Sequence, residues 1–382
     1  MILKRRFNLL LYGAFCVISC AEKEATEQDI FLDVSERKKF FIGEGGLTPD
    51  PLYFVSLDSS RRKGVIFNQL AHSLDSIFFS ADSAWVKEGV LMEMEGPYGV
   101  GTVFSFFTTE EHNVFMNPQQ FFNQKIKTKE VSMKFMAEFG LFGEMKYPAV
   151  SVPTPKVSHE FYGLDKNSGI GYFVFENDKQ INVMGYDSSL DSMFVLPVSL
   201  DSTQYFQLRF KVKWRNLIIG GNDEPQLSVV ANRLIVSYPT FSDILVYDLE
   251  SENQQIITST SKSFPTRRIR HENYADEVDS GELLDELENS WQKQVSYGII
   301  IYLEEPDKFV RVVKGEGGAD SSYFLEVLDQ NLQKVNEINL TEMNSDLSSD
   351  YLNSKYGLMF RAKDQPEEDV MYYYYVNLAQ KK

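Results

Sequence analysis

The sequence predicts an all-β fold assembled from repeated strand units. From residue 30 onward, short runs of β-branched and aromatic residues recur, as at 52–55, 234–236 and 299–302. Each run is bounded by Asp, Asn, Ser or Gly, which is typical of strands that end in tight turns. The 20 tyrosines and 29 phenylalanines of the chain also favour pleated sheets over helices.

A hydrophobic residue followed by Asp or Asn recurs at the ends of the predicted strands. Side chains of Asp and Asn bond readily to the backbone of a turn, which suits the point where one strand gives way to the next. The six copies are Leu57-Asp58, Phe122-Asn123, Tyr186-Asp187, Tyr247-Asp248, Leu328-Asp329 and Val376-Asn377, with Asp or Asn spaced by 65, 64, 61, 81 and 48 residues. Such units are longer than the commonest propeller repeats of ~40–50 residues, but they fit four-stranded blades with long loops.

The spacing of 81 residues predicts an insertion over residues 265–294. Within it, Leu283, Leu287 and Trp291 recur at the spacing of one helix face. Asp279 with Glu282 has the arrangement of a capping box. We therefore expect one short helix near 279–293, outside the strand repeat, packed on a blade edge or over one end of a ring of blades.

The spacing of 48 residues indicates that the sixth unit lacks its last strand, because only five residues follow Asn377. Residues 30–34 or 39–42 could supply that strand from the other end of the chain. Closing a ring in this way removes exposed sheet edges. We interpret residues 30–382 as a single β-propeller domain in which 30–42 completes the unit formed by 351–378.

The first twenty residues have the features of a secretory signal. Basic residues at positions 4–6 precede an apolar run over 7–18, which is too short to form a stable membrane-spanning helix. The motif Val-Ile-Ser-Cys at 17–20 resembles the bacterial lipobox. That resemblance implies that a signal peptide over 1–19 is removed and that Cys20 carries the lipid that attaches the chain to the membrane. The alternative is an unprocessed anchor helix with a chance cysteine.

Residues 20–29 are polar and acidic, which indicates a flexible tether. Acidic residues just after a lipid-bearing cysteine resemble the surface-export signals of Bacteroides-group lipoproteins, and a plain solvated linker fits equally well. We expect a lipoprotein of the bacterial outer membrane that faces the periplasm or the cell surface.

Charge and cysteine content exclude several classes of function. The formal net charge of −17 disfavours nucleic-acid binding, because an acidic surface repels phosphate backbones. Only Cys16 and Cys20 are present, so the folded body has no thiol for a disulfide, for thiolate catalysis or for a cysteine-ligated metal. The four histidines lack zinc spacing, and no nucleophile elbow or phosphate-binding loop is present. We expect a monomer with no cofactor, no metal and no catalytic residues.

Two loop segments supply candidate pocket residues. Glu95 and Tyr98 lie in a tight glycine-rich turn at 95–101. Arg267, Arg268 and Arg270 form a dense basic cluster in this acidic chain. Guanidinium groups can hold a carboxylate or phosphate. Alternatively, these arginines pair with the acidic helix that follows them.

Taken together, the lipobox, the sixty-residue units and the turn at 95–101 resemble a family of Bacteroides-group lipoproteins of unknown function with a six-bladed β-propeller shape. The segments 297–302 and 310–312 resemble the same family. The resemblance covers nearly the whole mature chain and implies six four-stranded blades. Since that family has no assigned activity, the resemblance implies no functional residue beyond Cys20.

The pattern as a whole favours a non-catalytic binding or interaction module for a protein or a glycan. We expect its binding surface at one end of the ring, where the loops are free to vary. The alternative is a propeller-type hydrolase or lyase with its active site in the central channel. The scattered histidines and the missing nucleophile motifs favour binding over catalysis.

Overall fold

The computed structural model describes residues 30–42, 55–96, 99–103, 105–117, 120–139, 163–176, 181–215, 217–220, 223–318, 321–367 and 370–380. The predicted signal peptide, the tether and Cys20 lie outside the described residues, as does Tyr98. Within the described part, strands predominate and the helices are few and short, so the predicted all-β fold is confirmed.

Five groups of four strands follow one another along the chain, and within each group every strand pairs antiparallel with the next. Sheet I holds β3 (Val55–Leu57), β4 (Lys63–Asn68), β5 (Ser73–Phe79) and β6 (Ser83–Leu91). Sheet II holds β7 (Ser105–Thr108), β8 (His112–Met116), β9 (Gln120–Lys125) and β10 (Val131–Phe135). Sheet III holds β11 (Leu164–Asp165), β12 (Ile170–Glu176), β13 (Ile181–Asp187) and β14 (Ser192–Val195). Sheet IV holds β17 (Gln226–Val230), β18 (Arg233–Tyr238), β19 (Phe241–Asp248) and β20 (Gln254–Ile257). Sheet V holds β22 (Ser296–Leu303), β23 (Lys308–Lys314), β24 (Tyr323–Leu328) and β25 (Lys334–Asn339).

Sheet VI combines the two ends of the described chain. It holds β26 (Leu347–Ser354), β27 (Gly357–Ala362) and β28 (Val370–Gln380), and β28 pairs antiparallel with both β1 (Ile30–Val34) and β2 (Lys38–Phe41). The prediction that segment 30–42 completes the last unit is therefore confirmed. The prediction of separate four-stranded units is wrong here, because β2 also runs parallel to β6 and joins sheets VI and I into one nine-stranded sheet.

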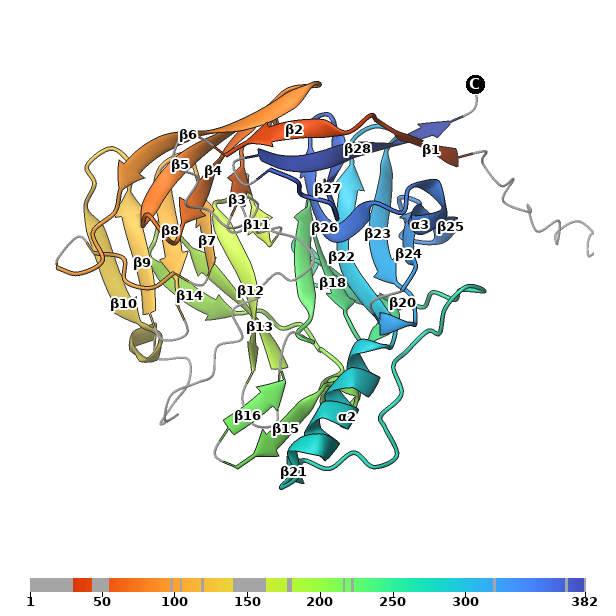
Figure 1. Ribbon diagram of the computed structural model, residues 1–382. Helices are drawn as coiled ribbons and strands as arrows, with labels where there is room; N and C mark the ends of the chain where they lie inside the picture. The colour runs from red at the N-terminus through yellow and green to blue at the C-terminus, as the bar shows by residue number, and fades with distance from the viewer. Residues whose placement is uncertain are drawn as a thin grey trace, which may run out of the picture.

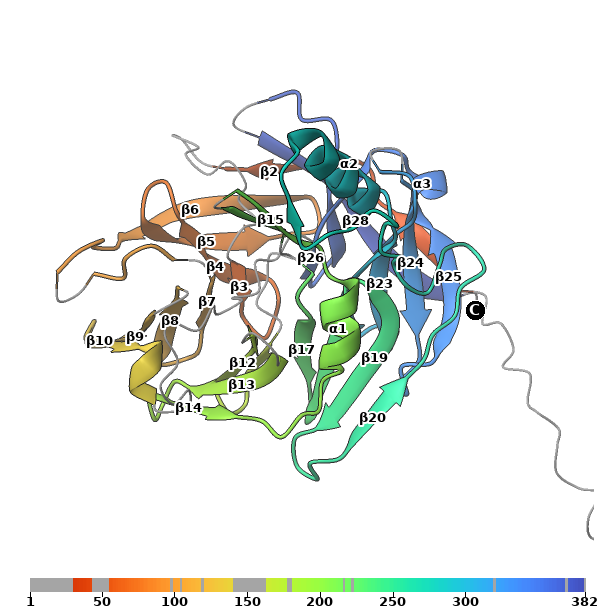
Figure 2. The ribbon, with the colours of Figure 1, turned by 90° about the horizontal axis from the view of Figure 1, so that it is seen from below.

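Buried apolar side chains fill the space between each pair of neighbouring sheets. Separate clusters lie between I and II, II and III, III and IV, IV and V, and V and VI. A sixth cluster joins VI back to I, where Tyr373 and Met371 pack with Ile66 and Val55. In Figure 2 the sheets lie side by side around the molecule in chain order. Burial on both faces explains why the strands read as nearly continuous apolar runs.

The predicted Asx turns lie at one end of the sheets, here called the turn end. Asp187 and Asp248 end the third strands of sheets III and IV, and Asp329 directly follows the third strand of sheet V. Each carboxylate accepts two backbone N–H groups of the turn that follows. Asn123 and Asn377 lie within the third strands of their sheets as well. Asp58, in contrast, follows β3, the first strand of sheet I, so the first copy of the motif is out of phase with the others.

Two insertions leave the opposite end of the sheets, here called the insertion end. Residues 196–225 hold α1 (Ser202–Leu208), β15 (Lys211–Trp214) and β16 (Leu217–Gly220), and residues 258–295 hold β21 (Glu277–Val278) and α2 (Gly281–Gln292). β15 pairs with both β16 and β21, so the two insertions share one small sheet. Figure 1 shows β15, β16, β21 and α2 grouped below the sheets, and this group is called the insertion unit. The predicted helix is confirmed, while α1, α3 (Leu340–Met343) and a 3-10 turn at Met136–Phe139 were not predicted.

Candidate interaction surface

Helix α2 packs one apolar face against the small sheet of the insertion unit. Leu284, Leu287 and Trp291 are buried against Phe210 and Val212, the latter on β15. The helix begins after Ser280, whose hydroxyl accepts a hydrogen bond from the Leu283 N–H at 3.4 Å. The predicted cap, Asp279, is therefore one residue too early. Serine and aspartate serve equally well as caps, so the sequence alone left two adjacent candidates.

A buried ion pair locks the two insertions together. The Arg268 guanidinium, 8% exposed, donates from Nη1 to Asp223 Oδ1 at 2.9 Å, and Asp223 is 7% exposed. Asp223 Oδ2 also accepts from the Phe210 N–H at 2.9 Å and from Trp291 Nε1 at 3.1 Å. Burial raises the pKa of Asp223, while Arg268 and these hydrogen bonds favour its charged form. Because Arg268 also donates from Nε to the Val295 carbonyl at 2.7 Å, it is an anchor for the insertion unit.

The other two arginines of the predicted cluster lie on the surface. Arg267 is exposed and forms an isolated backbone bridge with Phe241. Arg270 is exposed, and its guanidinium carbon lies 4.0 Å from the centre of the Tyr274 ring. Contact with the acidic face of α2 comes instead from His271, whose Nε2 lies 3.7 Å from Glu286 Oε1.

Glu95 lies in a different part of the molecule, on an exposed turn after β6 of sheet I. The base of this turn is held by His72, whose two ring nitrogens lie 2.7 Å from the Met92 carbonyl and 2.8 Å from the Gly101 carbonyl. Gly96 adopts a φ of 93°, which glycine tolerates at no steric cost. The structure does not bring Glu95 together with the arginines, and a pocket role for these residues stays a prediction.

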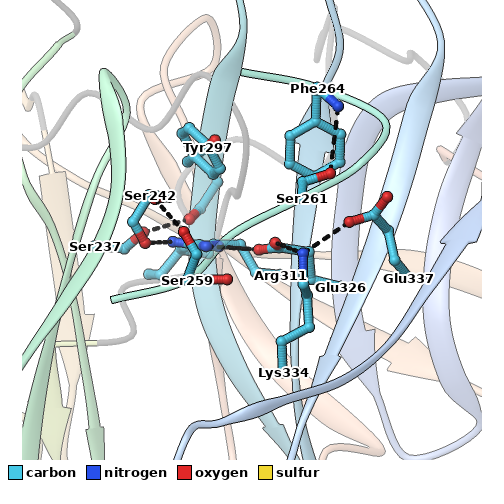
Figure 3. Close-up of polar contacts among 12 residues, drawn as sticks. Ser237, Ser242, Ser259, Ser261, Phe264, Tyr297, Arg311, Glu326, Lys334 and Glu337 are labelled. Carbon is cyan, nitrogen blue, oxygen red and sulfur yellow. Dashed lines mark hydrogen bonds and ion pairs between the residues drawn. The ribbon is translucent and has the colours of Figure 1, made fainter. Parts of the chain in front are cut away.

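A second buried ionic group lies between sheets IV and V (Figure 3). Arg311 of β23 is fully buried, and its Nε and Nη2 lie 2.7 and 2.6 Å from Glu326 Oε2 of β24. Arg311 Nη1 also donates to the Ser242 carbonyl at 3.0 Å. Lys334 then lies 3.4 Å from Glu326 and 2.8 Å from Glu337. The four side chains form a balanced row of alternating charge that runs from the interior to the outer strand of sheet V.

Apolar clusters enclose this row on both sides. Phe309 and Leu328 belong to one cluster, and Phe264 and Tyr297 belong to the other. The Arg311 guanidinium carbon lies 4.6 Å from the centre of the Tyr297 ring. Since ionic groups in such surroundings are stable only when they are paired, we assign the row a structural role.

The row predicts a pH dependence of stability. Burial opposes ionisation of Glu337, but hydrogen bonds from Lys334, Ser263 and Ser261 outweigh burial and lower its pKa below 4.5. A depressed pKa in the folded state adds stability above the unfolded value, and that stability is lost as the pH falls through the folded value. Glu337→Gln should therefore lower the free energy of unfolding at neutral pH and lose less on acidification than the wild type. Urea unfolding at neutral and acid pH measures this, with exposed Glu250→Gln as the control; equal acid losses in all three proteins would contradict it.

Exposed aliphatic side chains lie on the insertion unit and on the segment that leads into it. Leu217 is 57%, Ile218 65% and Ile269 72% exposed. A second exposed group, Leu70, Leu91 and Met94, surrounds the base of the turn that carries Glu95. Among the described residues of the short turns at the turn end, Leu190 is the exposed large apolar side chain. Contiguous exposed apolar residues mark interaction sites. Leu217 and Ile218 are neighbours on β16, so the insertion end is the candidate interaction surface.

Sequence reasoning missed the basic strand of this surface. Lys211, Lys213 and Arg215 alternate with Val212 and Trp214, a period of two that is typical of a half-buried strand. In the structure, Lys213 pairs with Glu277 of β21 at 2.7 Å. Within the part of the chain that the structure describes, no three acidic or histidine side chains group as a metal site, and no helix is both long and apolar enough to cross a bilayer.

These features define an all-β protein of packed, mainly antiparallel sheets, with an insertion unit at one end that carries exposed apolar side chains. The chain belongs to the DUF4221 family, a domain of unknown function, whose sequence profile matches residues 52–339. This assignment confirms the predicted membership of a family of unknown function.

Solved structures show the same fold. A member of the DUF4221 family from Bacteroides vulgatus is 11% identical, covers 93% of this chain and 100% of its own, and has a TM-score of 0.63. A protein from Bacteroides fragilis described as exported is 11% identical, covers 91% of this chain and 96% of its own, and has a TM-score of 0.50. At this identity the similarity shows fold alone. No curated protein matches the chain.

Proposed function

We propose that sheets I–VI are the blades of a six-bladed β-propeller. Six apolar clusters link the sheets in a cycle, I to VI and back to I, which supports this arrangement. The pairing of Ile30 with Gln380 and of Val34 with Val376 supports a ring closed by strands from both chain ends. A closed ring leaves two ends for recognition and no long exposed sheet edge.

We also propose that the protein is a lipoprotein of the outer membrane in the bacterial envelope. The lipobox at 17–20 supports it, and a structurally similar Bacteroides protein is described as exported. We predict that Cys20→Ala gives an uncut precursor that is poorly retained in membranes, because the lipid can no longer be attached. Membrane fractionation and the mass of the product measure this. Ser19→Ala, which keeps a small residue before the cysteine, is the control; wild-type processing and retention of Cys20→Ala would contradict the prediction.

The function that these features support best is non-catalytic docking of a protein partner at the insertion end. The observation that carries it is the unequal distribution of exposed apolar side chains. Leu217, Ile218 and Ile269 lie at the insertion end, against Leu190 among the described residues of the short turns at the other end. The buried Arg268–Asp223 pair fixes the insertions in place before binding, and a preorganised surface loses less conformational entropy on association.

Site-specific photo-crosslinking in cells tests this proposal. A photoreactive amino acid at Ile218 should give a discrete adduct with another protein, whereas the same amino acid at Leu190 should not. A second substitution, Ile269→Glu, should weaken the Ile218 adduct because it places a charge in the apolar surface. Equal adducts from both positions, no adduct from either, or an adduct only with a second copy of this chain would each contradict docking of a distinct partner at the insertion end.

A further inference from the structure

We infer that a pocket at the turn end binds a neutral saccharide of one or two rings. The pocket has a volume of about 430 Å³, within the ~300–1,000 Å³ that is usual for small-molecule sites. Sheets I, II and III all contribute to its wall, through the turns that follow β3, β7 and β11. It lies at the other end of the sheets from the proposed docking surface, so it is a separate site.

The walls of the pocket are held in place by hydrogen bonds between sheets. The buried Ser56 hydroxyl of β3 accepts from both the N–H and the hydroxyl of Thr108 of β7, each at 3.1 Å. From sheet III, Lys166 Nζ donates to the Leu57 carbonyl at 3.0 Å, across to sheet I. Thr109 fixes the β7–β8 turn, since its hydroxyl accepts the His112 N–H at 3.0 Å. The pocket is thus preformed, and a ligand does not have to order its walls.

The lining has the chemistry that sugar hydroxyls need. Hydroxyl groups come from Ser56, Ser59, Ser76, Thr108 and Thr109. The hydroxyls of Thr108 and Thr109 already donate to Ser56 and to the His112 carbonyl, so the donors for a ligand come from the three serines. Phe78 adds an aromatic ring, which stacks on Trp85 at 5.5 Å between ring centres with an interplanar angle of 14°. A saccharide presents hydroxyls at its edge and C–H groups on its faces, so polar and aromatic lining groups suit it together.

The charges of the lining favour a neutral ligand over an ion. Lys63 and Lys166 are balanced by Asp58 and Glu110. The Asp58 carboxylate accepts from the Ser60 hydroxyl at 2.9 Å, and Lys166 is bonded to backbone carbonyls. Lys63 of sheet I and Glu110 of sheet II therefore offer a donor and an acceptor on different walls. A carboxylate or phosphate ligand would meet Glu110 at a repulsive cost, whereas a hydroxyl can bond to either group.

The test is a titration of the purified protein with defined sugars, followed by calorimetry and saturation-transfer NMR. Lactose, cellobiose and maltose are the neutral probes, and glucuronate is the charged probe. We expect at least one neutral disaccharide to bind with one-to-one stoichiometry. Ser76→Tyr, which fills the pocket, should weaken binding at least about tenfold. Lys63→Ala at the exposed edge should weaken binding without affecting the fold.

Matched controls separate binding from folding. Ser192→Tyr adds the same bulk to a half-buried serine on β14, and Lys127→Ala removes an exposed lysine outside the pocket. Neither should change sugar affinity. The inference is overturned if no neutral sugar binds the folded wild type, if only glucuronate binds, or if the controls weaken binding as much as the pocket variants. None of these results bears on the crosslinks from Ile218, so the two proposals stand or fall separately.

Discussion

Replacing Glu326 by alanine should lower the free energy of unfolding by about 3–5 kcal/mol, because it leaves the Arg311 charge buried without its partner. Arg311 is 0% and Glu326 1% exposed, so water cannot replace the lost carboxylate. Arg311→Ala should cost a similar amount for the converse reason. Urea unfolding, with the midpoint and slope compared among variants, measures the effect.

The double variant Arg311→Met with Glu326→Leu separates pairing from packing. When both charges are removed, neither is left buried without a partner. The double variant should therefore lose far less stability than the sum of the single losses. Lys334 and Glu337 keep their own bond at 2.8 Å in this background. Simple additivity of the two single losses would contradict the assignment of the row as a paired structural element.

The exposed pair Lys213–Glu277 is the control. Its atoms are 2.7 Å apart, as close as those of the buried pair, but its side chains are 51% and 61% exposed. Glu277→Ala should therefore cost no more than about 1 kcal/mol. If the exposed pair costs as much as the buried pair, burial is not the source of the effect.

Periodicity and turn chemistry made much of the fold predictable. Leu283, Leu287 and Trp291 share a helix face in any context, which is why α2 could be located. Asp187, Asp248 and Asp329 cap turns through bonds to nearby backbone N–H groups, a local interaction that a sequence shows directly. Asp58 is out of phase because the motif marks a turn but does not say which strand of the sheet precedes it.

The pairing of distant side chains could not be read in the same way. Arg268 and Asp223 are 45 residues apart, and only the shared sheet of two insertions brings them together. Sequence reasoning therefore recognised a basic cluster but could not tell the buried anchor Arg268 from its exposed neighbours Arg267 and Arg270. The pocket at the turn end was missed for a related reason, since its serines and threonines form no spacing pattern within any one strand.

Removing residues 21–42 should destabilise the whole domain rather than fray one end. β1 and β2 pair with β28, and β2 also pairs with β6, so their loss exposes two strand edges at once. It also uncovers the buried cluster between sheets VI and I, to which Phe40 belongs. In a closed ring each sheet is held by both of its neighbours, so opening the contact between sheets VI and I should lower the stability of all the sheets.

Two adjacent phenylalanines on β2 give a sharper form of this prediction. Phe40 is 0% exposed and Phe41 is 46% exposed, because successive side chains of a strand point to opposite faces. Phe40→Ala should lower the free energy of unfolding by about 3–5 kcal/mol through the cavity it creates. Phe41→Ala should change it by no more than about 1 kcal/mol.

The manner of unfolding decides between a cooperative ring and a frayed end. Trp85 of β6 pairs with Phe41 of β2 and would report on the junction itself, so fluorescence is measured in a Trp85→Phe background. There Trp214 and Trp291 report on the insertion unit, far along the chain from β2, while circular dichroism reports on all strands. If the proposed ring is closed, both signals should shift together to lower denaturant concentration in Phe40→Ala, because the domain then unfolds as one cooperative unit. If tryptophan fluorescence keeps its wild-type midpoint while circular dichroism alone loses part of its signal, the N-terminal strands are a local addition and the closed ring is wrong.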